Sequence, residues 1–273
     1  MSLLSPESLS VFISPTELVA VRWRGIRPQI AEKRSCAVAT QPGLAWEGTI
    51  HALGELLREF SSCRRVKLIL SGHFIQYQLV PWREDLDDQE EELAVARLAF
   101  SQTYGEVAAR WQVRLSDEAP GMTRVAAAVD TALLAALEQV ADANKTQLVS
   151  IQPYLTAAIN CWHKRFDKNY SAWIVLHEEG QICMALIERG VWRWVRSIRV
   201  DADWSARLPE LLDNEMLLAG VEQGPAQALI FSPTTPELAV PADSSWSFRS
   251  LGLDARINFS PVSESRFSLA LVG

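Results

Sequence analysis

The sequence contains no apolar run long enough to cross a lipid bilayer. None of its hydrophobic stretches approaches the roughly 20 residues that a membrane-spanning helix needs. The first ten residues, MSLLSPESLS, have neither the basic end nor the long apolar stretch of a secretion signal. From these two absences we expect a cytoplasmic protein without a transmembrane segment.

Metal ligands are sparse and scattered. The four cysteines form no C-x-x-C pair, and the four histidines fall in different expected elements. Cys161 and His163 are the only close Cys/His pair, and a metal site needs more ligands at matched spacing. We therefore expect four buried thiols in a reducing compartment and no metal site.

Basic residues are outnumbered by acidic ones. The 273 residues carry a net charge of −7, which argues against a nucleic-acid protein because such proteins present a basic face. The chain is 48% hydrophobic, enough for one large core or two smaller ones. We expect one or two domains.

The short motifs of nucleotide and hydrolase chemistry are also missing. The sequence has no G-x-x-x-x-G-K-[ST] loop, no G-x-G-x-x-G fingerprint and no G-x-S-x-G elbow. Two acidic pairs, Asp87/Asp88 and Glu178/Glu179, lie in expected turns, where exposure to water explains them. His73 and His177 are interpreted as histidines of turns or of the core edge. We therefore assign no catalytic, cofactor-binding or metal-binding residue.

What the sequence does contain is a regular succession of short strands and helices. Alternating and helical hydrophobic periods predict the elements. In chain order they are strands 9–14 and 17–23, the run IAEKRSCAV, a helix from Leu44, strands 66–71 and 74–80, a helix capped by Asp87 and Asp88 and ending at Gly105, the strands ARWQVRL and TRVAAAVD, helix 131–144, the strand QLVSIQP and the helix YLTAAINCWHKRF.

The opening pattern then returns in the second half. After the polar segment DKNYS (167–171), residues 171–220 repeat the order strand, turn, strand, turn, strand, helix of residues 9–60. The apolar strand ALIFS follows. We expect an α/β protein of two related lobes, each with a mixed sheet built from a three-strand meander plus helices. The predicted boundaries are 1–166 for the first lobe, with an inserted strand-helix subdomain near 66–130, and 171–273 for the second.

Four stretches of the sequence resemble the actin-like (ribonuclease-H-like) assembly scaffolds of the PilM, MshI and GspL type. They are the hairpin VFISPTELVAVRW, the strand pair LSGHFIQYQLVPW before an acidic helix, LVSIQPYLTAAIN before the second meander, and SPVSESRFSLALVG, which resembles the start of a final helix returning to the core. The resemblance implies two lobes with a cleft between them. ATP-binding members hold phosphates between two hairpin turns, whereas others bind tails of inner-membrane proteins beneath a pilus or secretion platform.

The three segments that would contact a nucleotide lack the necessary chemistry. Backbone phosphate binding needs close approach and free N–H groups, which glycine permits. The first turn reads SPTE, with no glycine and a proline that has no N–H. The second, LHEEGQI, would place Glu178 and Glu179 beside a phosphate. The segment IFSPTTPEL stands where a Gly-Gly adenosine loop is expected.

A Trp/Arg-rich strand is the candidate partner site. Trp192 and Trp194 occupy alternate positions and are expected on one face, with Arg196 following and Arg193 opposite. One interpretation is an aromatic core rimmed by arginines. The other is a partner surface formed by Arg193, Trp194 and Arg196, because Trp and Arg are enriched at binding hot spots. The basic groups of the two meanders, which also include Arg22, Arg24, Arg27, Arg189 and Arg199, would suit an acidic tail or an anionic leaflet.

The prediction is a non-catalytic scaffold of a type IV pilus or type II secretion-like platform. It would bind the cytoplasmic tail of an inner-membrane protein, lie in the cytoplasm or peripherally at the inner membrane, and need no cofactor and no nucleic acid. Homodimerisation stays open. One alternative is a divergent actin-like ATPase or sugar-kinase-like enzyme, and another is a metabolite-binding regulator.

Overall fold

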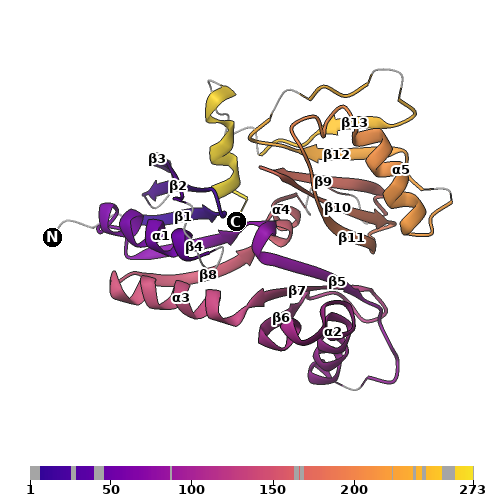
Figure 1. The fold of residues 1–273 in the computed structure, drawn as a ribbon, viewed down its shortest axis with the longest axis horizontal. Coiled ribbons are helices and arrows are strands. Elements are labelled where there is room, and N and C mark those ends of the chain that lie inside the picture. The colour runs from indigo at the N-terminus through magenta and orange to yellow at the C-terminus, as the bar shows by residue number, and fades with distance from the viewer. Residues whose placement is uncertain are drawn as a thin grey trace. The chain divides into compact units, whose positions relative to one another are not determined.

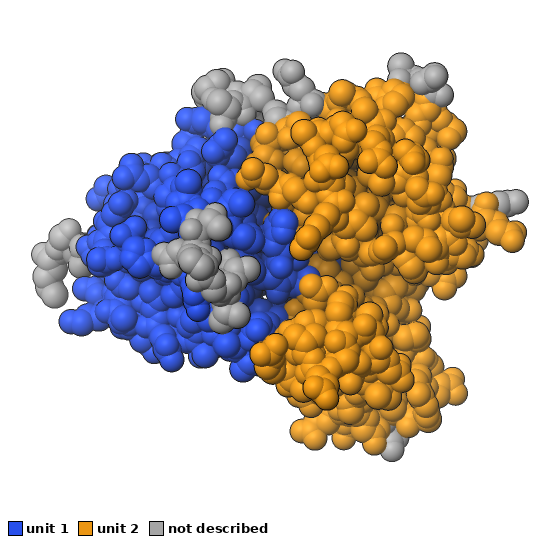
Figure 2. All heavy atoms as spheres, viewed as in Figure 1, with its two compact units in different colours: residues 1–75, 129–163, 258–273 blue, residues 76–128, 164–257 orange. Residues whose placement is uncertain are grey.

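The computed structural model has two compact units (Figures 1 and 2). One comprises residues 1–75, 129–163 and 258–273, and the other residues 76–128 and 164–257. The structure describes residues 7–25, 29–39, 46–86, 88–162, 166, 169–222, 224–235, 238–241, 244–253 and 262–272. Each unit combines stretches of the chain that are separate in the sequence but in contact in the structure. The lobe boundaries at 166 and 171 stay a prediction.

The first unit is built on a five-stranded mixed sheet of order β3-β2-β1-β4-β8. Strands β1 to β3 form an antiparallel meander, and β4 and β8 add to β1 in parallel. The strand bounds are β1 Glu7–Ile13, β2 Glu17–Arg24, β3 Gln29–Ala37, β4 Arg65–Leu70 and β8 Gln147–Pro153. Helices α1 (Glu47–Glu59), α3 (Thr131–Ala143) and α4 (Tyr154–Trp162) belong to the same unit.

The second unit repeats this sheet with the same topology. Its order is β11-β10-β9-β12-β13, again an antiparallel meander to which two strands add in parallel. The elements are β9 Ala172–Glu178, β10 Gln181–Glu188, β11 Val191–Arg199, helix α5 Leu208–Leu218, β12 Gln227–Phe231 and β13 Ser247–Ser250. All seven residues of β9 are buried, as expected of a central strand covered on both faces. The predicted architecture, two related α/β lobes that each contain a mixed sheet, is confirmed.

The repeat extends to an irregularity in the third strand of each meander. In β3, Ile30 pairs with Trp23 and Glu32 with Arg22, so that Ala31 has no partner on β2. In β11, Trp192 pairs with Ile187 and Trp194 with Leu186, so that Arg193 has no partner on β10. Both bulges fall at the third residue of the strand. A bulge shifts the alternation of side chains by one residue.

The remaining described strands form a three-stranded sheet of order β5-β7-β6. It comprises β5 Ile75–Val80, β6 Trp111–Leu115 and β7 Arg124–Asp130, with the short 3-10 helices η1 (Gly72–Phe74) and η2 (Gly105–Arg110) beside them. Helix α2 (Gln89–Tyr104) packs on this sheet through Ala96 and Phe100. As predicted, Asp88 caps this helix by accepting from Glu91 N, and Gly105 ends it with φ +68°. Asp87 lies outside the described residues.

Residues Val262–Ala270 form the 3-10 helix η4 in the first unit. Arg266 lies 3.6 Å from Glu17 of β2, and Lys33 of β3 pairs with Glu264. The C-terminal segment therefore returns to the first meander, as the resemblance implied. Among the described residues, no helix combines the length and the apolar character needed to cross a membrane.

Candidate functional site

The turn between β1 and β2 uses its backbone donors within itself. Ser14 N donates to Glu17 O at 3.0 Å. The Ser14 hydroxyl oxygen accepts from Thr16 N at 3.3 Å and from Glu17 N at 3.0 Å. Pro15 has no N–H to offer. Because each N–H of the SPTE turn has an acceptor inside the turn, none is left to hold a phosphate.

Replacing Ser14 by alanine should therefore loosen this turn. Ser14 is buried, and its hydroxyl also donates to Glu17 O at 2.9 Å. Loss of these bonds is expected to lower the free energy of unfolding by about 1–2 kcal/mol, measured by urea denaturation. Ser14→Thr, which keeps the oxygen, serves as the control. An alanine variant as stable as the parent would contradict the closed-turn geometry.

The turn between β9 and β10 keeps its acidic character. Gly180 adopts φ +75°, and its carbonyl accepts from Val200 N at 3.0 Å. Glu178 is buried at the end of β9, at the place where a phosphate would approach. A carboxylate there repels a phosphate unless a cation lies between them.

The segment after β12 packs against a histidine instead of forming an open loop. The ring of His177 stacks on Trp204, with 4.4 Å between centroids and 19° between planes. Its Nδ1 lies 2.9 Å from Ser232 Oγ and 3.4 Å from Thr234 Oγ1. Burial lowers the pKa of His177 to about 4, so the ring is neutral near pH 7. In the segment expected to form an adenosine loop, Ser232 and Thr234 therefore contact His177, which is a buried histidine with partners.

On strand β11, two of the three predicted partner residues are held by a buried carboxylate that sequence reasoning missed. Glu215 of α5 accepts from the Trp194 indole N–H at 2.7 Å and from Arg196 Nη1 at 3.0 Å. The Glu215 side chain is 4% exposed, whereas that of Arg196 is 47% exposed. Since Glu215 lies in a helix of acidic and apolar residues, its sequence alone offered no signal. The arrangement fixes the half-buried Trp194 and the exposed Arg196 side by side on the second unit.

The expectation that Trp192 and Trp194 share a face is wrong. The bulge at Arg193 changes the alternation, so Trp194 lies over Leu186 and Trp192 over Ile187, which are consecutive on β10 and point to opposite faces. Trp194 packs on the core formed with α5. The Trp192 indole instead donates to Glu118 at 3.1 Å. Trp194 and Arg196 do share a face, as predicted.

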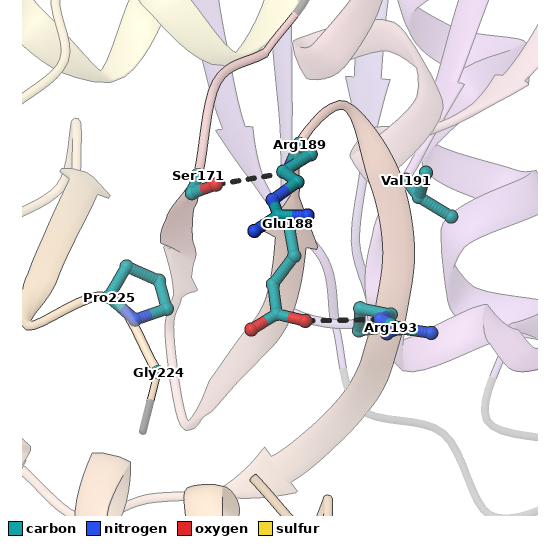
Figure 3. Close-up of a pocket in the computed structure, with 7 residues that line it drawn as sticks. All are labelled: Ser171, Glu188, Arg189, Val191, Arg193, Gly224 and Pro225. Carbon is teal, nitrogen blue, oxygen red and sulfur yellow. Dashed lines mark hydrogen bonds and ion pairs between the residues drawn. The ribbon is translucent and has the colours of Figure 1, made fainter. Parts of the chain in front are cut away.

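Arg193 lies beside a cavity at the β10–β11 hairpin (Figure 3). Its guanidinium pairs with Glu188 at 3.1 Å, and Ser171 Oγ accepts from Arg189 N at 2.9 Å. Arg189 adopts φ +50°, a conformation that is costly for a residue with a side chain. The cavity of about 620 Å³ is lined by Ser171, Glu188, Arg189, Val191, Arg193, Gly224 and Pro225.

A second cavity lies between β11 and the small sheet. It measures about 450 Å³, and Arg193 borders it as well. Its lining residues come from β5, the end of α2 and β11, namely Gln76, Tyr77, Gln78, Leu79, Thr103, Tyr104, Arg193, Trp194, Val195, Arg196 and Ser197. None of them carries a carboxylate, and two are arginines. All three predicted partner residues therefore line one groove.

The basic group of the first meander is neutralised by acidic neighbours. Arg22 lies 2.9 Å from Glu32 and 3.7 Å from Glu7, and Arg24 lies 3.5 Å from Glu7. Arg27 lies outside the described residues. The second meander differs in that Arg189, Arg193 and Arg196 border the two cavities described above.

Within the described part of the chain, no group of three or more Cys, His, Asp or Glu could hold a metal ion. Cys63 and Cys183 are buried thiols, and burial raises the pKa of Cys183 to about 12. Cys36 and Cys161 are partly exposed. His163, the neighbour of Cys161, lies outside the described residues.

Replacing Glu215 by leucine should destabilise the second unit. The change leaves the Trp194 indole N–H without its acceptor and Arg196 without its counter-ion, although Arg196 is exposed enough to turn towards water. We expect a loss of about 2 kcal/mol in the free energy of unfolding, measured by urea denaturation.

Glu210→Leu on the same helix is the matched control. Glu210 is 64% exposed and pairs with Arg207 at 3.6 Å. Surface pairs of this kind contribute about 0–1 kcal/mol. Equal losses in the two variants would show that Glu215 has no special role.

Two of the solved structures with a similar fold are a secretion protein and a pilus protein. The cytoplasmic domain of EpsL, an inner-membrane component of the type II secretion system of Vibrio cholerae, is 15% identical with a TM-score of 0.60, over 98% of this chain and 95% of that one. A chain of the PilM–PilN type IV pilus biogenesis complex is 13% identical with a TM-score of 0.67, over 97% and 96%.

A third similar structure is a Bacteroides thetaiotaomicron protein of unknown function with an actin-like ATPase fold. It is 13% identical with a TM-score of 0.58, over 83% of this chain and 81% of that one. No protein-family model matches the sequence, and no curated protein matches it. The chain therefore has the actin-like ATPase fold, in a form that nearly its whole length shares with the cytoplasmic domain of EpsL and with the PilM–PilN structure.

Proposed function

We propose that this protein is a non-catalytic assembly scaffold of a type IV pilus or type II secretion-like platform in the inner membrane. It binds the cytoplasmic tail of a membrane protein and works in the cytoplasm or peripherally at the membrane. The observation that carries this proposal is the groove bordered by Arg193, Trp194 and Arg196, whose Trp and Arg are held in place by the buried Glu215.

The absence of catalysis is supported by the state of the nucleotide segments. The SPTE turn satisfies its own N–H groups through Ser14, and Ser232 and Thr234, in the segment where an adenosine loop was expected, contact His177. In the first of the two expected turns these contacts leave no backbone N–H to cradle a phosphate, and in the second the buried Glu178 would repel one. We therefore expect no nucleotide turnover.

Calorimetric titration of Mg·ATP tests this part of the proposal. The expected result is no saturable heat up to millimolar nucleotide and no rise in thermal stability, since any ligand that binds only the folded state must stabilise it. Saturable binding with release of phosphate would contradict the scaffold proposal and favour the alternative, a divergent actin-like ATPase.

Membrane recruitment in the native host tests the binding role. Arg193→Glu reverses a charge whose only described ion pair is the exposed one with Glu188, so the fold should be little affected. We expect the membrane-bound fraction of the full chain to fall about tenfold, as for loss of an interface hot spot. The matched control is Arg34→Glu, because Arg34 lies on the edge strand β3 and pairs with Glu59 at 3.2 Å.

Two further arms separate a protein tail from lipid. Protease treatment of the membranes should abolish recruitment of the added full chain, and vesicles containing anionic phospholipid should not restore it. Recruitment by the vesicles alone, or an undiminished Arg193→Glu variant, would contradict the proposal.

A further inference from the structure

The outer edge of β11 is an unpaired sheet edge within the described part of the chain. β11 is the terminal strand of its five-stranded sheet, and β5 is the terminal strand of the three-stranded sheet. Both strands line the cavity of about 450 Å³. A free edge of this kind presents unpaired N–H and C=O groups to any extended segment that enters the cavity.

The ladder identifies which residues of β11 present these groups. Val200 N donates to Gly180 O at 3.0 Å, next to the register pair Arg199 and Gln181. Because hydrogen bonding alternates along an antiparallel strand, Ile198 and Arg196 also face β10. Val195 and Ser197 therefore direct their N–H and C=O groups outward, and both line the cavity.

The charged side chains of β11 itself all have one sign. The hairpin and strand carry Arg189, Arg193, Arg196 and Arg199. The carboxylates bonded to this segment are Glu188, Glu215 and, through the Trp192 indole, Glu118, which leaves a net charge of +1. The corresponding edge strand β3 carries charges of both signs, namely Glu32, Lys33 and Arg34. Edge charges commonly serve only to prevent aggregation. On β3, charges of both signs are enough to protect the edge from aggregation. The exclusively positive charge of β11 therefore favours an acidic segment as the occupant of its edge.

We infer that an extended acidic segment of the partner binds by adding as a strand to the outer edge of β11, an inference that rests on the proposed function. Its backbone pairs with Val195 and Ser197. Acidic side chains of the segment, Asp or Glu, meet Arg193 and Arg196, which both line the cavity. A second copy of this chain is a poorer occupant, because two β11 strands would bring like charges opposite one another.

The test uses a random dodecapeptide library displayed on phage and panned against the full chain. Enriched peptides are expected to be rich in Asp and Glu. The strongest is then synthesised unmodified and in two backbone N-methylated forms, each blocking one set of alternate N–H groups. One form should bind about tenfold or more weakly and the other should bind nearly normally, because only one set faces β11. This arm leaves the protein unchanged.

A protein variant provides the complementary arm. Val195→Pro removes one outward N–H but no ladder bond with β10, and edge strands tolerate proline. Peptide affinity should fall about tenfold, while Val195→Ala binds as the parent and both variants unfold at similar temperatures. If the proline variant is misfolded, the N-methylated peptides decide alone.

Several outcomes would overturn the strand-addition inference. They are neutral or basic enriched peptides, no enrichment at all, equal binding of the two N-methylated forms, or a dimer in sedimentation that Val195→Pro dissociates. The experiments distinguish failure of the strand-addition inference from failure of the proposed function. If Arg193→Glu abolishes membrane recruitment but Val195→Pro does not, the tail-binding role stands and strand addition fails.

Discussion

Replacing Trp173 by alanine is expected to cost about 3–5 kcal/mol in the free energy of unfolding, the largest effect predicted for a single substitution in this chain. Trp173 lies on β9, between Leu186 of β10 and Ala228 of β12, and it is fully buried. It packs in the core cluster that also contains Trp204 and the buried residues Leu208 and Leu212 of α5. Neighbouring strands on both sides prevent the site from collapsing around the lost ring, so most of the cavity should persist.

Two controls accompany this substitution in urea denaturation. Trp173→Phe keeps most of the ring, and it removes an indole N–H that has no acceptor among the described residues. Its cost should be only about 1 kcal/mol. Trp82→Ala, at a residue that is 38% exposed, should change stability by less than about 0.5 kcal/mol. Similar losses for Trp173→Ala and Trp82→Ala would contradict the position of Trp173 in the core.

Acidification is expected to destabilise the protein through His177. Burial lowers its pKa from the ordinary 6.5 to about 4, so the folded protein resists protonation that the unfolded chain accepts. The stabilisation by neutral His177 is complete above pH 6.5 and is lost as the pH falls towards 4. Since one pKa unit corresponds to about 1.4 kcal/mol, the total loss should be about 3 kcal/mol.

His177→Phe isolates this contribution. Phenylalanine keeps an aromatic ring against Trp204 but cannot be protonated, and it gives up the hydrogen bond to Ser232. The measurement is the free energy of unfolding in urea at several values between pH 7.5 and 4. We expect the parent to lose about 3 kcal/mol more than the variant over that range. Parallel pH profiles for the two proteins would show that His177 is not buried as described.

Local sequence patterns predicted the elements that carry strong periodicity. Helix α1 buries Leu53 and Leu57 on the face expected from their spacing, and α2 begins and ends at Asp88 and Gly105 through capping that is encoded locally. The strand β13 was missed. Its sequence, SFRS, is short and mostly exposed, and its strand conformation depends on parallel pairing with β12.

The features of the site that sequence could not predict all depend on contacts between distant residues. The His177 cluster brings together Trp204, Ser232 and Thr234, and the Trp194 indole finds Glu215 on a different element. The bulge at Arg193 depends on the register with β10, which the sequence of one strand does not reveal. Residue types at the groove were predictable, whereas the residues that hold them in place were not.

The matching bulges at Ala31 and Arg193 have a consequence for how such a surface can evolve. Deleting Ala31 or Arg193 would restore regular pairing and leave every other side chain on its present face, because the residues on either side of each bulge already have partners on the neighbouring strand. In β11 that deletion would keep Trp192 over Ile187 and Trp194 over Leu186. Loss of a single codon, with no substitution, would thus remove Arg193 from both cavities while the strand around it keeps its pairing.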